Sequence, residues 1–451
     1  MSAHPPATWL LEQETRALLT RLALVRPFVL QETTDAAAAL SPAALSGIEQ
    51  HLIAGRREVR AKAQAYLHWL RGPGAAAPAA EQQRRFWQLR LAFQTALAQF
   101  DLFSEVITQR SEEDNGVLLS GLDVAAAEAL LLPGRFFEGP PVVCSLHRGL
   151  GGAIRRARTR LPGGGDNPVA LIRIPRERMI GYGVASSLVH EVGHQGAALL
   201  KLVESLRAEL RPILLRTWMR TAWGLWDRWI SEIVADLWSI ARIGIGSTLG
   251  LIGLVSLPRG VVFRPSDDDP HPMPWVRVHL SCTIGDRLYP DPQWSGLAAT
   301  WRAMYPLAGL RPQLVATIAE LRATMPHLVS LLVGHRPPLL RGRSLGEVLR
   351  SPDLHREALL RRFAAWEADP DRMTVEPPTV AFAVLGQARA SGRLSPERES
   401  RLLRRLIASW AVRSSLETAR ATTRSAAGMF VGQPTIWTGP SDPIPLRRPA
   451  I

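Results

Sequence analysis

Apolar residues recur at helical spacing along most of the chain. In the segments TWLLEQETRALLTRLALV (8–25) and RRFWQLRLAFQTALAQFDLF (84–103) they occur at positions i, i+3, i+4 and i+7. The same spacing returns from residue 305 to 430. The pattern predicts a helical N-terminal region, residues 1–132, and a helical C-terminal region, residues 305–430. The Pro- and Gly-rich tail, residues 431–451, is expected to be loosely held.

The pattern changes between these two helical regions, from residue 133 to 304. Pro, Gly and β-branched residues gather near 131–144, and the segment GLGGAIRRARTRL (149–161) predicts a basic helix. After a Gly-rich turn, PVALIRIP (168–175) predicts a strand at the edge of a small sheet. A long helix should start near Gly183, with a break at Pro212. The expected fold is therefore α+β and mainly helical, with a central region at 133–304 between helical flanks.

The motif HEVGH, residues 190–194, lies in the helix predicted to follow this strand. Residues four apart share one face of a helix, so the imidazoles of His190 and His194 can reach the same ion. Zinc accepts such nitrogens and keeps one position for water in catalytic sites. Glu191 is close enough to move protons without binding the metal. The alternative is two surface histidines on an ordinary amphipathic helix.

A third ligand is available in WISEIVADLW, where Glu232 and Asp236 stand four residues apart on an apolar helix. Two carboxylates on such a face are costly to bury unless a cation compensates them. Glu232 is then expected to bind the metal, and Asp236 to accept the free N–H of a ligand imidazole. The alternative is that both carboxylates form ion pairs with Arg228 or Arg242.

HEVGH followed by ExxxD on a later helix resembles the gluzincin clan of zinc metallopeptidases. The resemblance covers about 168–285. It implies that residues 133–304 form a zincin-like catalytic core that binds Zn²⁺ through His190, His194 and Glu232. It further implies that Glu191 is the general base and that Asp236 supports a ligand histidine.

The segment HPMPWVR contains His271, Pro272 and Arg277, and it is similar to the His-Pro…Arg element of CAAX-processing and heat-shock-type gluzincins. The resemblance implies that His271 and Arg277 are catalytic donors to the carbonyl oxygen, with Tyr182 as a further candidate. The alternative is structural, with the prolines shaping a turn and Arg277 pairing with one of the aspartates at 267–269.

The net charge of +14 does not by itself indicate a nucleic-acid ligand. Lys62 and Lys201 are the only lysines among 54 basic residues, and the arginines are spread through the predicted helices near acidic residues. We therefore expect no specific nucleic-acid binding. A basic adaptor with an accidental HExxH motif stays open as an alternative.

The apolar run at 243–258 bears on the membrane. It is shorter than the roughly 20 residues that a spanning helix needs, and Gly and Pro interrupt it. We expect a buried core segment and no stable membrane insertion. The first residues do not match a signal peptide and the chain has only two cysteines, which indicates a cytoplasmic protein.

Taken with the resemblance, these features predict a zinc metallopeptidase that hydrolyses a peptide or protein substrate by zinc-activated water. A substrate peptide could add as an extra strand to the edge strand expected at 168–175. A non-catalytic scaffold or binding protein stabilised by zinc is the alternative. The intact Glu191 counts against it, because a structural site has no use for that carboxylate.

Overall fold

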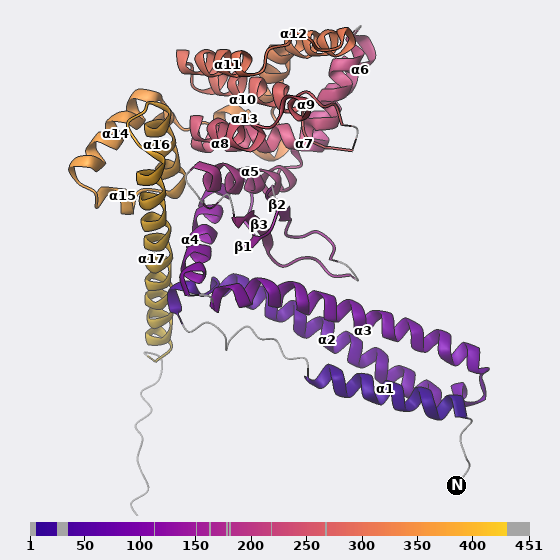
Figure 1. Ribbon diagram of the computed structural model, residues 1–451. Helices are drawn as coiled ribbons and strands as arrows, with labels where there is room; N and C mark the ends of the chain where they lie inside the picture. The colour runs from indigo at the N-terminus through magenta and orange to yellow at the C-terminus, as the bar shows by residue number, and fades with distance from the viewer. Residues whose placement is uncertain are drawn as a thin grey trace, which may run out of the picture.

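A computed structural model describes most of the chain. The described ranges are 6–24, 35–111, 113–149, 151–161, 164–176, 179, 182–217, 219–266 and 268–430. The predicted tail, residues 431–451, lies outside the described residues. Within these ranges the protein is mainly helical with one small sheet (Figure 1), which confirms the predicted class of a mainly helical α+β protein.

Three strands and a series of helices follow one another along the chain. The strands are β1 (Val142–His147), β2 (Ala153–Arg155) and β3 (Ala170–Pro175). The helices before the sheet are α1 (Pro6–Leu24), α2 (Pro42–Arg71), α3 (Ala79–Thr108) and α4 (Glu113–Leu130). Those after it are α5 (Tyr182–Leu199), α6 (Leu202–Arg216), α7 (Arg220–Ile243), α8 (Ile245–Val255), α9 (Arg259–Val262), α10 (Pro274–Leu288), α11 (Pro292–Met304), α12 (Pro312–Gly334), α13 (Leu345–Leu349), α14 (Arg356–Ala368), α15 (Arg372–Val375), α16 (Pro378–Ala390) and α17 (Pro396–Phe430).

Strands β1 and β3 are buried on both faces, because their side chains alternate between two apolar clusters. Val143 and Leu171 pack with residues of α2 and α3, whereas Cys144 and Ile172 belong to the large core that includes α5. In Figure 1 the sheet accordingly lies between α5 and the N-terminal helices. The sheet therefore supports the N-terminal part of the structure on one side and α5 on the other.

The strand order corrects the predicted position of the strand at 168–175. That strand is β3, and it lies in the middle of the sheet, in the order β1-β3-β2. It pairs parallel with β1 and antiparallel with the short strand β2. The edge strand near α5 is therefore β2. The alternation of residues in one strand does not reveal how many neighbours that strand has.

The basic helix predicted at 149–161 is wrong, because this segment contains β2 and a turn. Hydrogen bonds from distant residues hold it extended. The Ala157 N–H donates to Gln195 Oε1 at 2.9 Å, and the Arg158 N–H donates to the Asn167 carbonyl at 2.8 Å. Gly149 has φ 143°, which other residues rarely adopt. Tertiary pairing thus outweighs the helical spacing of the apolar residues.

The break predicted at Pro212 is also wrong. Pro212 lies inside α6, and the chain turns earlier, at Lys201, which has the left-handed φ of 53°. Proline leaves the carbonyl four residues before it without a helical partner. That residue, Ala208, is exposed, so water can hydrogen-bond to its carbonyl.

Helices α5 and α7 pack closely because two glycines on α5 leave room for α7. A Cβ at Gly193 would lie 2.9 Å from the Ala235 Cα, and a Cβ at Gly196 would lie 2.4 Å from the Trp238 ring. The Trp238 indole in turn donates to the Ala129 carbonyl at 3.1 Å. This close approach brings the HEVGH face of α5 against the Glu232 face of α7.

The remaining helices surround this pair. One apolar cluster extends from Leu119 to Trp410 and includes residues from both the predicted catalytic core and the predicted C-terminal helical region. The apolar run at 243–258 forms α8, most of which is buried. Among the described residues, no helix combines the length and apolarity needed to cross a membrane.

Replacing Gly193 by alanine is expected to destabilise the fold by about 1–3 kcal/mol, the usual cost of forcing extra atoms into a packed core. The new Cβ would meet the Ala235 backbone, which cannot rotate away. Thermal unfolding measures the effect, and Gly224→Ala is the matched control. A Cβ at Gly224 of α7 meets nothing within 4 Å, so this change should be neutral or slightly stabilising. Equal melting temperatures of the two variants would refute the close approach.

Candidate metal centre

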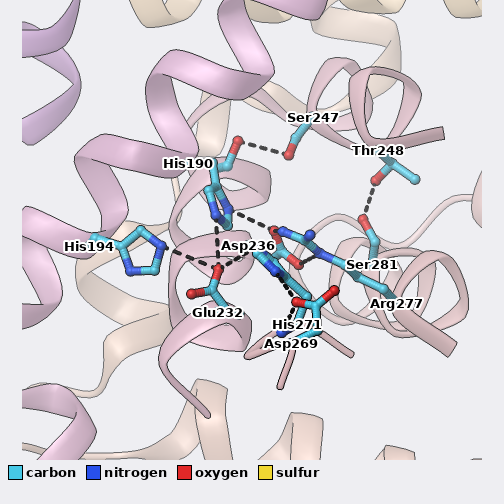
Figure 2. Close-up of polar contacts among 11 residues, drawn as sticks. His190, His194, Glu232, Asp236, Ser247, Thr248, Asp269, His271, Arg277 and Ser281 are labelled. Atoms are coloured by element: carbon cyan, nitrogen blue, oxygen red, sulfur yellow. Dashed lines mark hydrogen bonds and ion pairs between the residues drawn. The ribbon is translucent and has the colours of Figure 1, made fainter. Parts of the chain in front are cut away.

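Three histidines from α5 and the segment before α10 converge on one carboxylate oxygen of α7. The Nε2 atoms of His190 and His194 each lie 3.3 Å from Glu232 Oε2, and His271 Nε2 lies 3.0 Å from the same atom. Figure 2 shows Glu232 between His194 and His271, with His190 above it. The structure thus brings together the three expected ligands and His271.

These spacings have the size that a metal site requires. Zinc binds imidazole nitrogen and carboxylate oxygen at about 2.0–2.2 Å in tetrahedral geometry, so two neighbouring ligand atoms are separated by roughly 3.3 Å. The distances from Glu232 Oε2 to the nitrogens of His190 and His194 match this value. Among the described residues, the set whose possible ligand atoms all lie within 4.8 Å of one another is His190, Glu232 and His271; His194 lies 3.3 Å from Glu232 Oε2 but is not in this set.

His271 is a second possible partner for the same ion. Potential ligand atoms of His190, Glu232 and His271 lie within 4.8 Å of one another. The His271 ring is fixed from behind by Asp269, whose Oδ1 lies 2.7 Å from His271 Nδ1. Its side chain is 39% exposed, against 15% for His194. His271 therefore stands on the open side of the centre, where it can meet either the metal or a ligand.

Asp236 lies behind His190, one helical turn after Glu232. Its Oδ1 lies 2.8 Å from His190 Nδ1, so the imidazole presents Nε2 to Glu232. The Arg277 guanidinium donates to both oxygens of Asp236, at 2.7 and 2.8 Å, and is itself buried. Arg277 thus pairs with Asp236. The alternative drawn from the sequence paired Arg277 with one of the aspartates at 267–269. Residue 267 lies outside the described residues.

The charges of this group are strongly coupled. Burial alone would raise the pKa of Glu232, but hydrogen bonds from the three histidines hold the pKa far below its usual range. Burial alone would lower the pKa of His190, but Asp236 and Glu232 raise it to about 9. Arg277 outweighs burial and lowers the pKa of Asp236. Glu232 and Asp236 therefore both carry a negative charge, which favours protonated histidines or a bound cation beside them.

Glu191 is buried beside a cavity of about 920 Å³ that His190, His271 and Arg277 also line. The carboxylate has room because residue 152 is glycine: a Cβ there would lie 2.7 Å from Glu191 Oε1. Gly152 directly precedes β2, and Gly152, Glu191, His190 and His271 line the same cavity. The glycine run before β2 was the only sequence signal for this contact.

Tyr182 stands at the other end of the same cavity. It begins α5, two turns before His190, and its ring lies 5.8 Å from the guanidinium of Arg389. Arg389 and its partner Glu399 also line the cavity, although no motif in the sequence marks them. Tyr182 therefore lines the cavity two helical turns before His190, whereas His271 contacts Glu232 directly.

Comparisons of the chain with protein-family models, with curated proteins and with solved structures find no match. Function is therefore inferred from the chain's own residues.

Proposed function

We propose that this chain is a zinc-dependent metallopeptidase in which His190, His194 and Glu232 hold the metal and Glu191 is the general base. The observation that carries the proposal is the set of imidazole nitrogens at 3.0–3.3 Å from one buried carboxylate oxygen. A neutral imidazole and carboxylate donor set suits zinc among the common metals. When bound, the ion would acidify a water molecule and polarise a carbonyl group.

The chain's own groups account for the remaining needs of peptide hydrolysis. The Glu191 carboxylate borders the cavity and can take a proton from the attacking water and pass it to the leaving amine. Asp236 and Arg277 hold the His190 ring in one orientation. His271 Nε2, on the open side, can donate to the carbonyl oxygen as negative charge develops there.

The edge strand β2 offers a way to position the substrate. It has β3 on one side, and its Ala153 and Arg155 side chains are exposed. An extended peptide can hydrogen-bond to such an edge and so add a strand. Because Gly152 contacts Glu191, a peptide lying on β2 would pass beside the general base.

The direct test is hydrolysis of a peptide library by zinc-loaded protein. We expect chelation to abolish cleavage and added zinc to restore it, because the carboxylate alone is a weak catalyst. A zinc-loaded, folded protein that cleaves no peptide would contradict the proposal.

A non-catalytic zinc site is the second candidate, and one observation favours it. If His271 joins the other three residues as a ligand, the metal has four protein ligands, which is typical of closed structural sites. The burial of Glu191 next to the open cavity favours the catalytic alternative.

Replacing His271 by alanine distinguishes these two candidates. A donor to the carbonyl oxygen, when removed, is expected to lower turnover by roughly a hundred- to a thousandfold while zinc content stays near one per chain. A ligand, when removed, would instead lower zinc content. Turnover, zinc content and thermal unfolding are measured on the same preparation. Loss of zinc in His271→Ala would favour the closed site.

Replacing Asp236 by asparagine is expected to weaken zinc binding by about 10–100-fold, the usual effect of losing the partner of a ligand histidine. The amide keeps the shape but cannot hold the same charge between His190 and Arg277. Competition with a chelator measures the affinity. The control is Asp227→Asn on the same helix, whose carboxylate pairs with Arg207 away from the centre. Equal zinc affinities of Asp236→Asn and Asp227→Asn would show that Asp236 does not support the metal site.

A further inference from the structure

A second hollow, of about 330 Å³, lies on the other side of the segment that contains His271. It is bounded by the first half of α7, the first half of α12 and residues 264–266, 269 and 271–274. Asp269, His271 and Pro272 line both this hollow and the larger cavity. The two spaces therefore meet at the histidine that contacts Glu232.

The inner wall of the hollow is apolar. Leu225, Trp229, Met273, Leu314 and Leu321 line it. Trp229 precedes Glu232 by three residues and so lies one helical turn away on the same side of α7. The hollow is thus placed to receive the residue next to a bond that is cut at the metal centre. Its volume is at the lower end of the range for ligand pockets, which suits one side chain.

Trp229 has an unsatisfied polar atom in this wall. Its side chain is only 5% exposed, and within the described part of the chain its indole N–H has no hydrogen-bond acceptor. The neighbouring Trp226, in contrast, donates to Thr324 Oγ1 at 2.8 Å. Trp301 and Trp410 carry the same kind of unpaired buried indole N–H, so this atom does not by itself indicate a ligand, and the contribution of Trp229 to the hollow is its apolar ring.

The charged residues of the hollow are mainly basic. Arg228, Arg264 and Arg311 line it, and Asp269 is the acidic residue among them. The Asp269 carboxylate already accepts from the backbone N–H and the ring of His271. Neither Arg264 nor Arg311 makes a side-chain ion pair or hydrogen bond among the residues that the structure describes. Two guanidinium groups are therefore available at the rim of an apolar hollow, which suits a carboxylate.

We propose that this hollow binds the C-terminal residue of a peptide substrate. The apolar side chain would lie against Trp229 and Leu321, and the α-carboxylate would pair with Arg264 and Arg311. The inference rests on the proposed peptidase function and refines it: the protein removes an apolar residue from the C-terminus. The bond that is cut is the last peptide bond; water adds across it, giving a shortened peptide and a free amino acid.

Binding tests the hollow without hydrolysis. The probes are N-acetyl-phenylalanine with a free carboxylate and its C-terminal amide, titrated by calorimetry into the full chain treated with a chelator. We expect the acid to bind at least about tenfold more tightly than the amide, because the charged hydrogen bonds to arginine are lost with the amide. Arg264→Gln and Arg311→Gln should each reduce this difference. The control Arg90→Gln, an exposed arginine on α3, should not. Equal binding of acid and amide, or a difference that both rim variants leave intact, would overturn the inference.

Hydrolysis separates the inference from the proposed function. Zinc-loaded protein is given the same peptide ending in phenylalanine as the free acid or as the amide. Preference for the acid, lost in Arg264→Gln at unchanged zinc content, supports the inference. Equal cleavage of both peptides at internal bonds overturns it and leaves the peptidase proposal intact. If the acid binds tightly but neither peptide is cleaved, the hollow binds a C-terminal residue as inferred, and the proposed peptidase function is contradicted.

Discussion

Replacing Glu191 by glutamine is expected to lower peptide hydrolysis by a factor of at least about a hundred, the usual scale for a lost general base. Glutamine keeps the size of the side chain beside Gly152 but cannot accept a proton at neutral pH. The effect should appear in the rate of turnover at saturating substrate. Zinc content and melting temperature should stay close to those of the unchanged protein, since Glu191 is not among the expected ligands.

Two results would contradict this account of Glu191. Unchanged turnover would remove Glu191 from the mechanism while leaving a zinc site possible. A proportional loss of zinc would make Glu191 a ligand. Glu357→Gln is a suitable control, because this carboxylate of α14 is 88% exposed and lies outside both cavities.

Replacing Glu232 by alanine is expected to remove most of the bound zinc. Glu232 Oε2 is the atom on which His190, His194 and His271 converge, so the variant removes the charged oxygen that lies between them. Asp236 and Asp269 still pair with His190 and His271, but they lie behind these rings, and activity should fall with the metal content. Elemental analysis after removal of free metal measures the result. Zinc at about one per chain in both proteins would exclude Glu232 as a ligand.

Much of this centre could be predicted from local sequence. The spacing of His190 and His194 fixes their common face on any helix, and the apolar surroundings of Glu232 and Asp236 indicate that these carboxylates need a cation. The class of the fold also followed from helical periodicity over most of the chain. These features depend on residues that are close together in the sequence.

The rest of the centre depends on packing between distant segments. The approach of α5 to α7 requires Gly193 and Gly196 to face Ala235 and Trp238, and neither contact has a periodic signal. The pairing of Arg277 with Asp236 joins residues 41 positions apart. In the sequence, Arg277 has nearer acidic residues, so the choice among them was open. Distance along the chain does not determine which carboxylate a buried arginine meets.

The sheet illustrates the same limit. The spacing of Ile154, Ala157 and Leu161 suits a helix, yet Asn167 and Gln195 hold this segment extended. The edge strand near Glu191 is therefore β2, which local propensity does not favour. The surroundings of Glu191 and the proposed substrate edge thus both depend on hydrogen bonds from residues far away in the sequence.

Anomalous scattering at the zinc edge, measured on crystals of the zinc-loaded protein, locates the metal directly. We expect one peak per chain, between the imidazoles of His190 and His194 and the carboxylate of Glu232. His271 should be free to meet a ligand on the open side. A peak bound by His190, Glu232 and His271 without His194 would contradict the proposed ligand set. Zinc-loaded crystals with no peak at Glu232 would contradict the metal site itself.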